Sequence, residues 1–341
     1  MRILITGGAG FIGCNLAEAC IRAGHRVQLF DNLSRRGSAA NLAWLHSIFG
    51  EAGFEFVQGD IRDYRAIEAA TEGAEAVYHL AAQTAVTTSV TDPRPDFEIN
   101  ALGTFNVLEA ARSAAHDPIF IFSSTNKVYG GMEDAPAQEL AARYVLPDYP
   151  HGVSEERPLD FHSPYGCSKG AADQYVRDYS RIYGLRSVVF RQSCIYGQRQ
   201  MGVEDQGWVA WFVIAAVTGR PITIYGNGKQ VRDLLHVDDL VRAFQTATER
   251  IETTAGQVYN LGGGPDNTLA IWTEFGPLLS ELLGKPVVPA GFSDWRPGDQ
   301  PVFVADIDKA RRQFGWAPRV GVREGITRLF AWVQANRELF A

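Results

Sequence analysis

Residues Thr6-Gly-Gly-Ala-Gly-Phe-Ile-Gly13 join a short β-branched run to an amphipathic stretch, and this join decides the fold. Glycines at 7, 10 and 13 permit a tight turn, let the backbone approach a pyrophosphate, and let a helix pack closely on a strand. The N-terminus of that helix offers N–H donors to phosphate. The stretch therefore predicts a dinucleotide-binding turn between the first strand and the first helix.

A second strand pattern ends in Asp31, 18 residues after Gly13. A carboxylate at that place accepts the ribose hydroxyls of a dinucleotide and repels a 2′-phosphate, so the sequence favours NAD over NADP. Arg35 and Arg36 follow closely and could either pair with such a phosphate or lie in a solvated loop. Asp60, after the third strand, has two interpretations: a contact to the adenine edge or the N-cap of the next helix.

Short β-branched runs alternate with helical patterns through the first two-thirds of the chain, which predicts a doubly wound parallel Rossmann sheet of the α/β class. The expected strands are Arg2–Thr6, Arg26–Asp31, Phe54–Gln58, Ala76–Leu80, Ile119–Ser123 and Ser187–Arg191, and the clearest helices are Pro95–Ala114 and Pro164–Tyr183. Residues 1–190 are expected to bind the cofactor. Residues 191–341 are expected to form mostly a smaller α/β substrate-binding lobe, with some segments returning to the first domain.

Composition narrows the class of partner. The 341 residues carry 32 Lys+Arg against 39 Asp+Glu, a net charge of −7 that argues against nucleic acid as the partner. The longest apolar stretch, Trp208–Val217, is too short to span a bilayer, so no membrane association is expected. Four cysteines without ligand spacing predict neither a metal site nor a disulfide framework, and indicate a reduced cytoplasmic protein.

Tyr165 and Lys169 supply the strongest chemical signal. Residues four apart share one face of a helix, so the Lys169 ammonium can stabilise a Tyr165 phenolate and allow it to act as a base near neutral pH. The run Ser123-Ser-Thr125 follows the fifth strand and adds a hydroxyl at the same end of the sheet. Thr125, Tyr165 and Lys169 are therefore the predicted catalytic residues.

Together these motifs resemble the extended short-chain dehydrogenase/reductase family, whose members act mainly on nucleotide sugars. The resemblance also rests on Asp60-Ile61, His79-Leu-Ala-Ala82, Asn100, Arg232-Asp233, His236-Val-Asp-Asp239, and Arg296 before Gly298-Asp299. It implies that the tyrosine is the acid/base, that the lysine also binds the nicotinamide ribose, and that Thr125 bonds the reacting sugar oxygen. The late arginines would grip the nucleotide diphosphate, a role suited to a guanidinium.

Within the family, Asn126-Lys127 stand where the 4,6-dehydratases carry Asp-Glu, which argues against a dehydratase. Uridine-sugar 4-epimerases usually carry an asparagine near the position that Cys194 occupies here, and a cysteine lacks the amide donors of that asparagine. Four longer strings, starting at Ser123, Asp160, Val203 and Gly226, resemble the CDP-paratose 2-epimerases. This resemblance implies inversion of carbon 2 of a CDP-linked hexose through a 2-keto intermediate. A UDP-sugar 4-epimerase is the alternative, and a non-catalytic NAD-binding regulatory protein a distant one.

The expected NAD contacts are Gly7, Gly10, Phe11, Ile12, Gly13, Asp31, Asn32, Ser34, Arg35, Asp60, Ile61, Leu80, Ala81, Ala82, Asn100, Ser123, Ser124, Tyr165, Lys169 and Gln192. The expected nucleotide-sugar contacts are Gln83, Thr125, Asn126, Lys127, Cys194, Arg199, Gly207, Trp208, Tyr225, Arg232, Arg296 and Asp299.

Several of these residues have a purely structural alternative. Trp208 and Trp211 could belong to the core, Arg199 to the surface, and Gln83 to a loop; for His236-Val-Asp-Asp239 a strand-to-helix junction capped by an Asp is preferred. Family members are usually dimers or tetramers through paired helices, so a homo-oligomer through residues 100–115 and 165–183 is expected.

Overall fold

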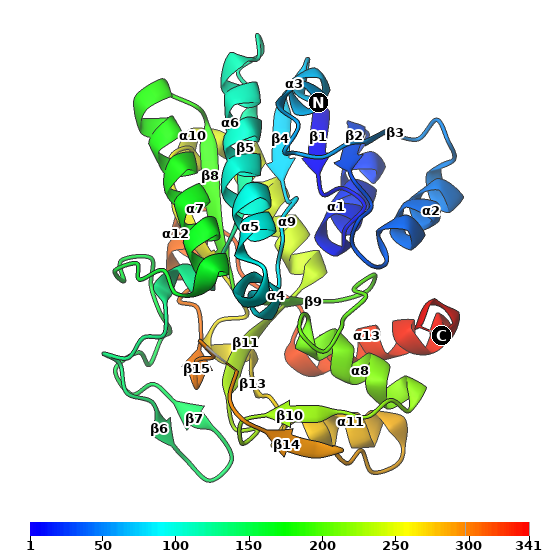
Figure 1. The fold of residues 1–341 in the computed structure, drawn as a ribbon, viewed down its shortest axis with the longest axis vertical. Coiled ribbons are helices and arrows are strands. Elements are labelled where there is room, and N and C mark those ends of the chain that lie inside the picture. Colours follow the sequence, from blue (N-terminus) through cyan, green and yellow to red (C-terminus); the bar gives the residue numbers. More distant parts are fainter. Residues whose placement is uncertain (297, 341) are drawn as a thin grey trace.

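The computed structural model describes residues 1–296 and 298–340 (Figure 1). Its centre is a parallel sheet of seven strands in the order β12-β8-β5-β4-β1-β2-β3. The strands are β1 (Arg2–Thr6), β2 (Arg26–Asp31), β3 (Glu55–Gln58), β4 (Ala76–His79), β5 (Ile119–Thr125), β8 (Ser187–Gln192) and β12 (Val258–Leu261). The strand order reverses between β1 and β4, which is the switch point where open α/β sheets bind ligands. The predicted doubly wound fold is confirmed.

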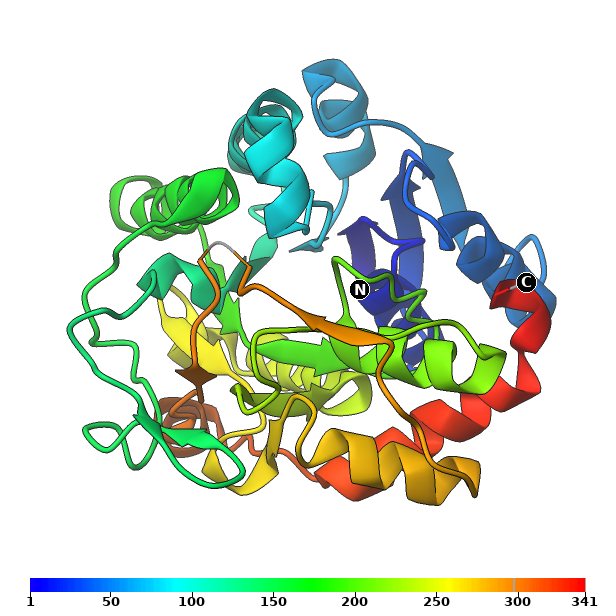
Figure 2. The same ribbon diagram turned by 60° about the horizontal axis from the view of Figure 1, so that its bottom comes forward.

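Helices cover both faces of this sheet (Figure 2). Alternate residues of β1 point to opposite faces, so Leu4 belongs to one core and Ile3 and Ile5 to the other. The first core is closed by α3 (Tyr64–Thr71), α6 (Gly103–Ser113) and α7 (Ser163–Tyr183). The second is closed by α1 (Phe11–Arg22), α2 (Ser38–Phe49), α9 (Val237–Glu249), α10 (Ile251–Thr254) and α12 (Asp308–Phe314).

A smaller lobe with its own apolar core lies beyond the lower end of the large sheet in Figure 1. One of its sheets joins β9 (Cys194–Tyr196), β11 (Val231–His236), β13 (Thr268–Ala270) and β15 (Val302–Phe303). A second pairs β10 (Thr223–Tyr225) with β14 (Gly291–Ser293). Its helices are α8 (Trp208–Thr218), α11 (Phe275–Leu283), α13 (Val322–Ala335) and two short 3-10 turns, Pro265–Asn267 and Arg337–Phe340.

The helix expected over residues 95–114 is made of three pieces: α5 (Pro93–Phe97), a π-helical turn (Glu98–Leu102) and α6. A short helix that the sequence analysis did not predict, α4 (Val86–Thr91), precedes it. The expected loop over residues 130–162 contains a small hairpin, β6 (Gln138–Glu139) and β7 (Tyr144–Val145). No helix in the described part of the chain is long and apolar enough to cross a membrane.

Two helix caps differ from expectation. Asp63, not Asp60, caps α3, because its carboxylate accepts the N–H groups of Arg65 and Ala66. At α9 the cap is His236 rather than an aspartate, since its Nδ1 accepts the Asp238 N–H at 3.3 Å. Asp239 instead accepts backbone N–H groups from residues 319 and 320, which ties α9 to the segment before α13.

Candidate active site

The glycine-rich turn forms one wall of a cavity at the carboxyl end of β1. Gly7 has φ +70°, and a Cβ atom there would lie 2.7 Å from the backbone nitrogen of Ala81. A Cβ atom on Gly13 would lie 2.2 Å from the Gly7 carbonyl oxygen, so the helix could not pack this closely on the turn. Helix α1 starts after Gly10 without a side-chain cap, which leaves its first N–H groups for an anion.

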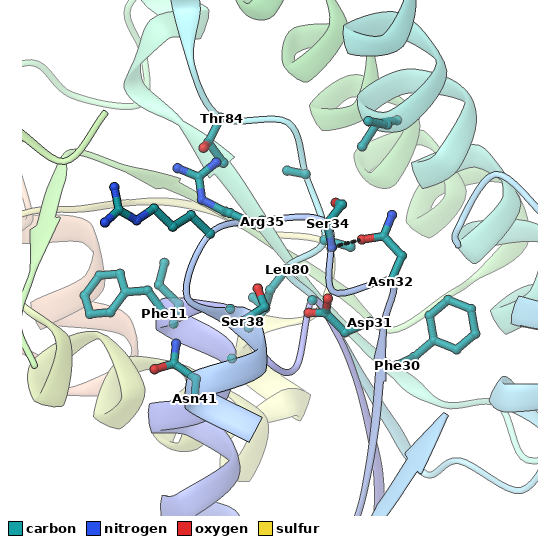
Figure 3. Close-up of a pocket in the computed structure, with 18 of the residues that line it drawn as sticks. Phe11, Phe30, Asp31, Asn32, Ser34, Arg35, Ser38, Asn41, Leu80 and Thr84 are labelled. Atoms are coloured by element: carbon teal, nitrogen blue, oxygen red, sulfur yellow. Dashed lines mark hydrogen bonds between the residues drawn. The ribbon is translucent and has the colours of Figure 1, made fainter. Parts of the chain in front are cut away.

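Asp31 stands at the end of β2 and faces the same cavity (Figure 3). Its carboxylate accepts the Ala9 N–H at 3.1 Å and the Leu33 N–H at 2.8 Å, and burial raises its pKa. Asn32 donates to the Asp60 carboxylate at 3.0 Å. Hydrogen bonds from Arg62 are the main reason that the pKa of Asp60 is lowered, so this carboxylate is charged and already partnered.

The cavity has a volume of about 1080 Å³, part of it open to solvent. Fourteen of the expected cofactor residues line it: Gly7, Gly10, Phe11, Ile12, Gly13, Asp31, Asn32, Ser34, Arg35, Asp60, Ile61, Leu80, Ala81 and Ala82. The close backbone approach, the open helix N-terminus and the carboxylate at β2 together fit a dinucleotide whose ribose lacks a 2′-phosphate.

Eleven further residues line this cavity without being among the expected cofactor contacts. These are Phe30, Arg36, Ser38, Asn41, Gly59, Thr84, Ile99, Arg199, Gln200, Met201 and Gln206. Most lie outside any motif. Residues 199–206 reach the cavity only because the connection between β9 and α8 crosses it, a long-range placement without a local signal.

Five expected cofactor residues do not line either cavity, namely Asn100, Ser123, Ser124, Lys169 and Gln192. The Asn100 side-chain amide accepts the Gln83 N–H and donates to the Gln83 carbonyl oxygen. It also donates to Asp96 and Ser168. The Ser124 hydroxyl donates to Asp173 at 2.8 Å. The polar groups of Asn100 and Ser124 thus hold the surrounding helices in place.

Tyr165 and Lys169 lie in the first two turns of α7, as their spacing predicts. The Tyr165 N–H donates to the Ser89 hydroxyl of α4 at 3.1 Å, which fixes the start of the helix. The Lys169 ammonium donates to the Ser123 carbonyl oxygen at 2.6 Å and lies 4.3 Å from the centroid of the Phe122 ring. The lysine is therefore anchored to the end of β5, which also carries Thr125.

Burial dominates the ionisation of this pair. It raises the pKa of Tyr165 to about 12, while a hydrogen bond with Thr125 acts in the opposite direction. Burial also lowers the pKa of Lys169 to about 7, against the charges of Asp173 and Asp96, which raise it. A phenolate thus needs stabilising by its neighbours, and the lysine can gain or lose its proton near neutral pH.

A second cavity, about 1180 Å³ with its open part, begins at Tyr165 and runs into the smaller lobe. Ten of the twelve expected substrate residues line it: Thr125, Asn126, Lys127, Cys194, Gly207, Trp208, Tyr225, Arg232, Arg296 and Asp299. Thr84 and Gln206 line both cavities, so the two meet at these residues. Arg35 of the first cavity is close enough to Tyr165 of the second for its charge to lower the pKa of the tyrosine.

Three cations project into the second cavity. Arg232 donates to the Asp299 carboxylate at 2.5 Å, and Lys127 donates to the Gly298 carbonyl oxygen at 3.2 Å. The Arg296 guanidinium lies 4.0 Å from the centroid of the Tyr225 ring and donates to a backbone carbonyl in the β9–α8 connection. This arrangement of charge beside an aromatic ring suits a phosphorylated ligand that also carries a flat base.

Two expected substrate residues, Gln83 and Arg199, do not line the second cavity. Gln83 closes a local turn, with its amide bonded to both the N–H and the carbonyl of Ala85. Arg199 lines the first cavity and lies between the rings of Trp44 and Trp332. Trp208, by contrast, both packs on Phe275 and lines the second cavity. No cluster of metal-ligating side chains occurs among the residues that the structure describes.

Comparison with known proteins places the chain beside nucleotide-sugar enzymes. The model of the GDP-mannose 4,6-dehydratase family matches residues 4–329. A CDP-paratose 2-epimerase of Salmonella typhi is 44% identical over 98% of this chain and 100% of its own. A UDP-glucose 4-epimerase of Thermotoga maritima, solved with UDP-glucose, is 31% identical with a TM-score of 0.84, covering 99% and 100% of the two chains. A Thermus thermophilus UDP-glucose 4-epimerase in complex with NAD is 31% identical with a TM-score of 0.81, covering 98% and 100%.

Proposed function

The chain belongs to the GDP-mannose 4,6-dehydratase family of extended short-chain dehydrogenases/reductases, and from this premise we propose that it is an NAD-dependent epimerase that inverts carbon 2 of a CDP-hexose. One observation carries the proposal: Tyr165 stands where a cavity fitted to a dinucleotide meets a cavity lined by three cations. The similarity to a CDP-paratose 2-epimerase over nearly the whole chain supports the choice of carbon and base.

The dinucleotide would be held by the glycine-rich turn, the open start of α1 and the Asp31 carboxylate. When bound, it supplies a hydride acceptor in the first half of the reaction and a hydride donor in the second. The nucleotide diphosphate would lie against Arg232 and Arg296, whose planar guanidinium groups suit phosphate oxygens. This assignment leaves the sugar ring beside Tyr165 and Thr125.

Tyr165, as phenolate, removes the proton from the 2-hydroxyl while the hydrogen on carbon 2 leaves as hydride. Thr125, whose hydrogen bond lowers the pKa of Tyr165, would hold the reacting oxygen, and the Lys169 ammonium, one helical turn further along α7, would stabilise the phenolate. Once the 2-keto sugar had turned its other face to the cofactor side, Tyr165 would return the proton to the oxygen. The net result is inversion without consumption of the cofactor.

The side chains around Thr125 argue against elimination of water. The two residues that follow it, Asn126 and Lys127, carry no carboxylate. The carboxylates that line the second cavity are already partnered: Asp299 with Arg232, Asp205 with Arg296, and Glu204 with the Tyr225 hydroxyl. An acid and base for dehydration would therefore have to come from groups that already have partners, whereas Tyr165 alone can serve as both acid and base in an epimerisation.

A UDP-sugar 4-epimerase is the second candidate, favoured by the similarity to the Thermotoga maritima enzyme. Proton NMR of the purified protein with CDP-paratose, CDP-glucose and UDP-glucose, each without added NAD, separates the two. Inversion at carbon 2 of a CDP-sugar is the expected result. Inversion at carbon 4 of UDP-glucose alone would replace the proposal by the second candidate.

We further propose that residues 1–190 bind the cofactor and residues 191–341 mostly the nucleotide sugar, with α9, α12 and β12 returned to the large sheet. The protein is expected to work in a reducing, cytoplasmic environment, which its four free cysteines support. A homo-oligomer through α6 and α7 is supported by exposed apolar side chains on them, among them Phe105 (38% exposed), Tyr175 (51%) and Ile182 (66%). Light scattering of the protein after gel filtration tests this state.

A further inference from the structure

The connection between β9 and α8 crosses from one cavity to the other. Arg199, Gln200, Met201 and Gln206 line the first cavity, whereas Glu204, Asp205, Gln206 and Gly207 line the second. Figure 2 shows this green segment reaching from the smaller lobe toward the large sheet. We call residues 198–207 the strap.

Polar contacts fix the strap to the helices beside the first cavity. Asn15 of α1 donates to the Gln198 carbonyl oxygen at 3.2 Å, and Asn41 of α2 donates to the Arg199 carbonyl oxygen at 3.3 Å. Across the cavity, Arg35 donates to the Gln206 side chain at 2.6 Å. The strap is therefore attached to the nucleotide-binding side by its backbone at one end and by a side chain at the other.

Arg199 connects the strap to both lobes. Its guanidinium carbon lies 3.7 Å from the centroid of the Trp44 ring on α2 and 5.6 Å from that of Trp332 on α13. The residue has φ +70°, a left-handed conformation that costs energy for a side chain other than glycine. Such a conformation persists only where the surroundings hold it, and here the two indole rings and the Asn41 amide do so.

We propose that Arg199 is a positioning residue for cofactor retention: held between Trp44 and Trp332, it keeps the strap closed over the bound dinucleotide between the two hydride transfers. This inference rests on the proposed function, because only an enzyme that reuses its cofactor in each turnover needs to keep it.

The test measures retention of NAD itself. We expect the Arg199→Ala protein to be purified with a smaller fraction of bound NAD and to release NAD about tenfold faster, which corresponds to about 1.4 kcal/mol. Arg199→Lys, which keeps the charge but loses the flat stacking group, should fall in between. Arg323→Ala is the matched control, because Arg323 lies on α13 but pairs only with the exposed Glu281 among the described residues.

Saturating NAD should restore kcat of Arg199→Ala to within about twofold, since the reacting groups are untouched. Trp332→Leu repeats the measurement from the other lobe should Arg199→Ala fail to fold. Wild-type NAD release in the folded Arg199 or Trp332 variants would overturn the proposal, as would a kcat that saturating NAD does not restore. Because NAD release is measured without a sugar, it decides the matter even if no CDP-sugar is epimerised.

Discussion

Arg191 of β8 and Asp173 of α7 form a buried ion pair with two hydrogen bonds, each 2.9 Å long. The Ser124 hydroxyl donates to the same carboxylate at 2.8 Å. The Asp173 carboxylate therefore connects α7 to both β5 and β8 by hydrogen bonds. Asp173 is one helical turn beyond Lys169, and its charge is the first of those that raise the pKa of that lysine. The pair thus both fixes and tunes the turn of α7 that carries the catalytic ammonium.

Replacing Asp173 by Asn should lower the free energy of unfolding by about 3–5 kcal/mol, because the Arg191 guanidinium would remain buried without a counter-charge. Urea unfolding followed by circular dichroism measures the change. Asp178→Asn, an exposed position on the same helix, is the control and should change stability by less than about 0.5 kcal/mol. Equal stability of the two variants would show that the ion pair is not what holds α7 to the sheet.

Tyr165→Phe should reduce kcat by at least about 100-fold, since it removes the group that takes and returns the proton. The NAD content of the purified protein should stay unchanged, because the dinucleotide cavity is built by other residues. Tyr64→Phe, on α3 and outside both cavities, serves as the control. A Tyr165→Phe enzyme with most of its activity would remove the tyrosine from the mechanism.

Thr125→Val should shift the pH dependence of kcat toward alkaline pH. The hydrogen bond with Thr125 lowers the pKa of Tyr165, so its loss raises that pKa and reduces the phenolate present at any given pH. A shift of about one pH unit, and a roughly tenfold lower kcat near pH 7.5, are expected. Thr125→Ser keeps the hydroxyl and should restore the profile. An unshifted profile in the valine variant would mean that Thr125 acts by position alone.

Asp31→Ala should weaken NAD binding by about tenfold or more and reduce the preference for NAD over NADP. The carboxylate is both an acceptor for ribose hydroxyls and the negative charge that repels a 2′-phosphate. Titration of the protein with each dinucleotide, followed by fluorescence, gives the two affinities. Asp266→Asn, exposed and far along the sequence, should leave both affinities unchanged. An unaltered ratio in Asp31→Ala would move the discrimination to Arg35 or Arg36.

The cofactor half of the site could be predicted because its signals are local. The glycines at 7, 10 and 13, and Asp31 at the end of the next strand, occupy places that the backbone of a βα unit fixes in advance. The Tyr165 and Lys169 pair is local too, since helical spacing alone sets their common face. Residues of this kind keep their predicted place whatever the rest of the chain does.

The residues that were missed or misplaced depend on long-range packing. Arg199 lines the first cavity rather than the second, beside two indole rings from distant parts of the sequence, Trp44 and Trp332. Asn100 is buried, and its amide bonds Gln83, Asp96 and Ser168 from neighbouring segments. Neither the spacing nor the composition of the sequence predicts these contacts, because they depend on how distant segments pack in the folded protein.

His79 provides a test of stability against pH. Its ring bonds Thr6 at 2.7 Å and Thr104 at 2.9 Å, and burial lowers its pKa to about 3. Below pH 6.5, the ordinary pKa of histidine, His79 is protonated in the unfolded chain but stays neutral in the folded one. The contribution of His79 to the free energy of unfolding is therefore complete above pH 6.5 and is lost as the pH falls toward 3.

Of the stability that the wild-type protein loses between pH 7 and pH 5, about 2 kcal/mol should come from His79. The His79→Gln variant should be less stable than the wild type at pH 7. Its free energy of unfolding in urea should nevertheless decline by about 2 kcal/mol less than that of the wild type between pH 7 and pH 5. His116→Gln, at an exposed position, should follow the wild-type decline. Parallel declines in all three proteins would mean that His79 accepts its proton in the folded state, and the neutral bridge between β1 and α6 would have to be abandoned.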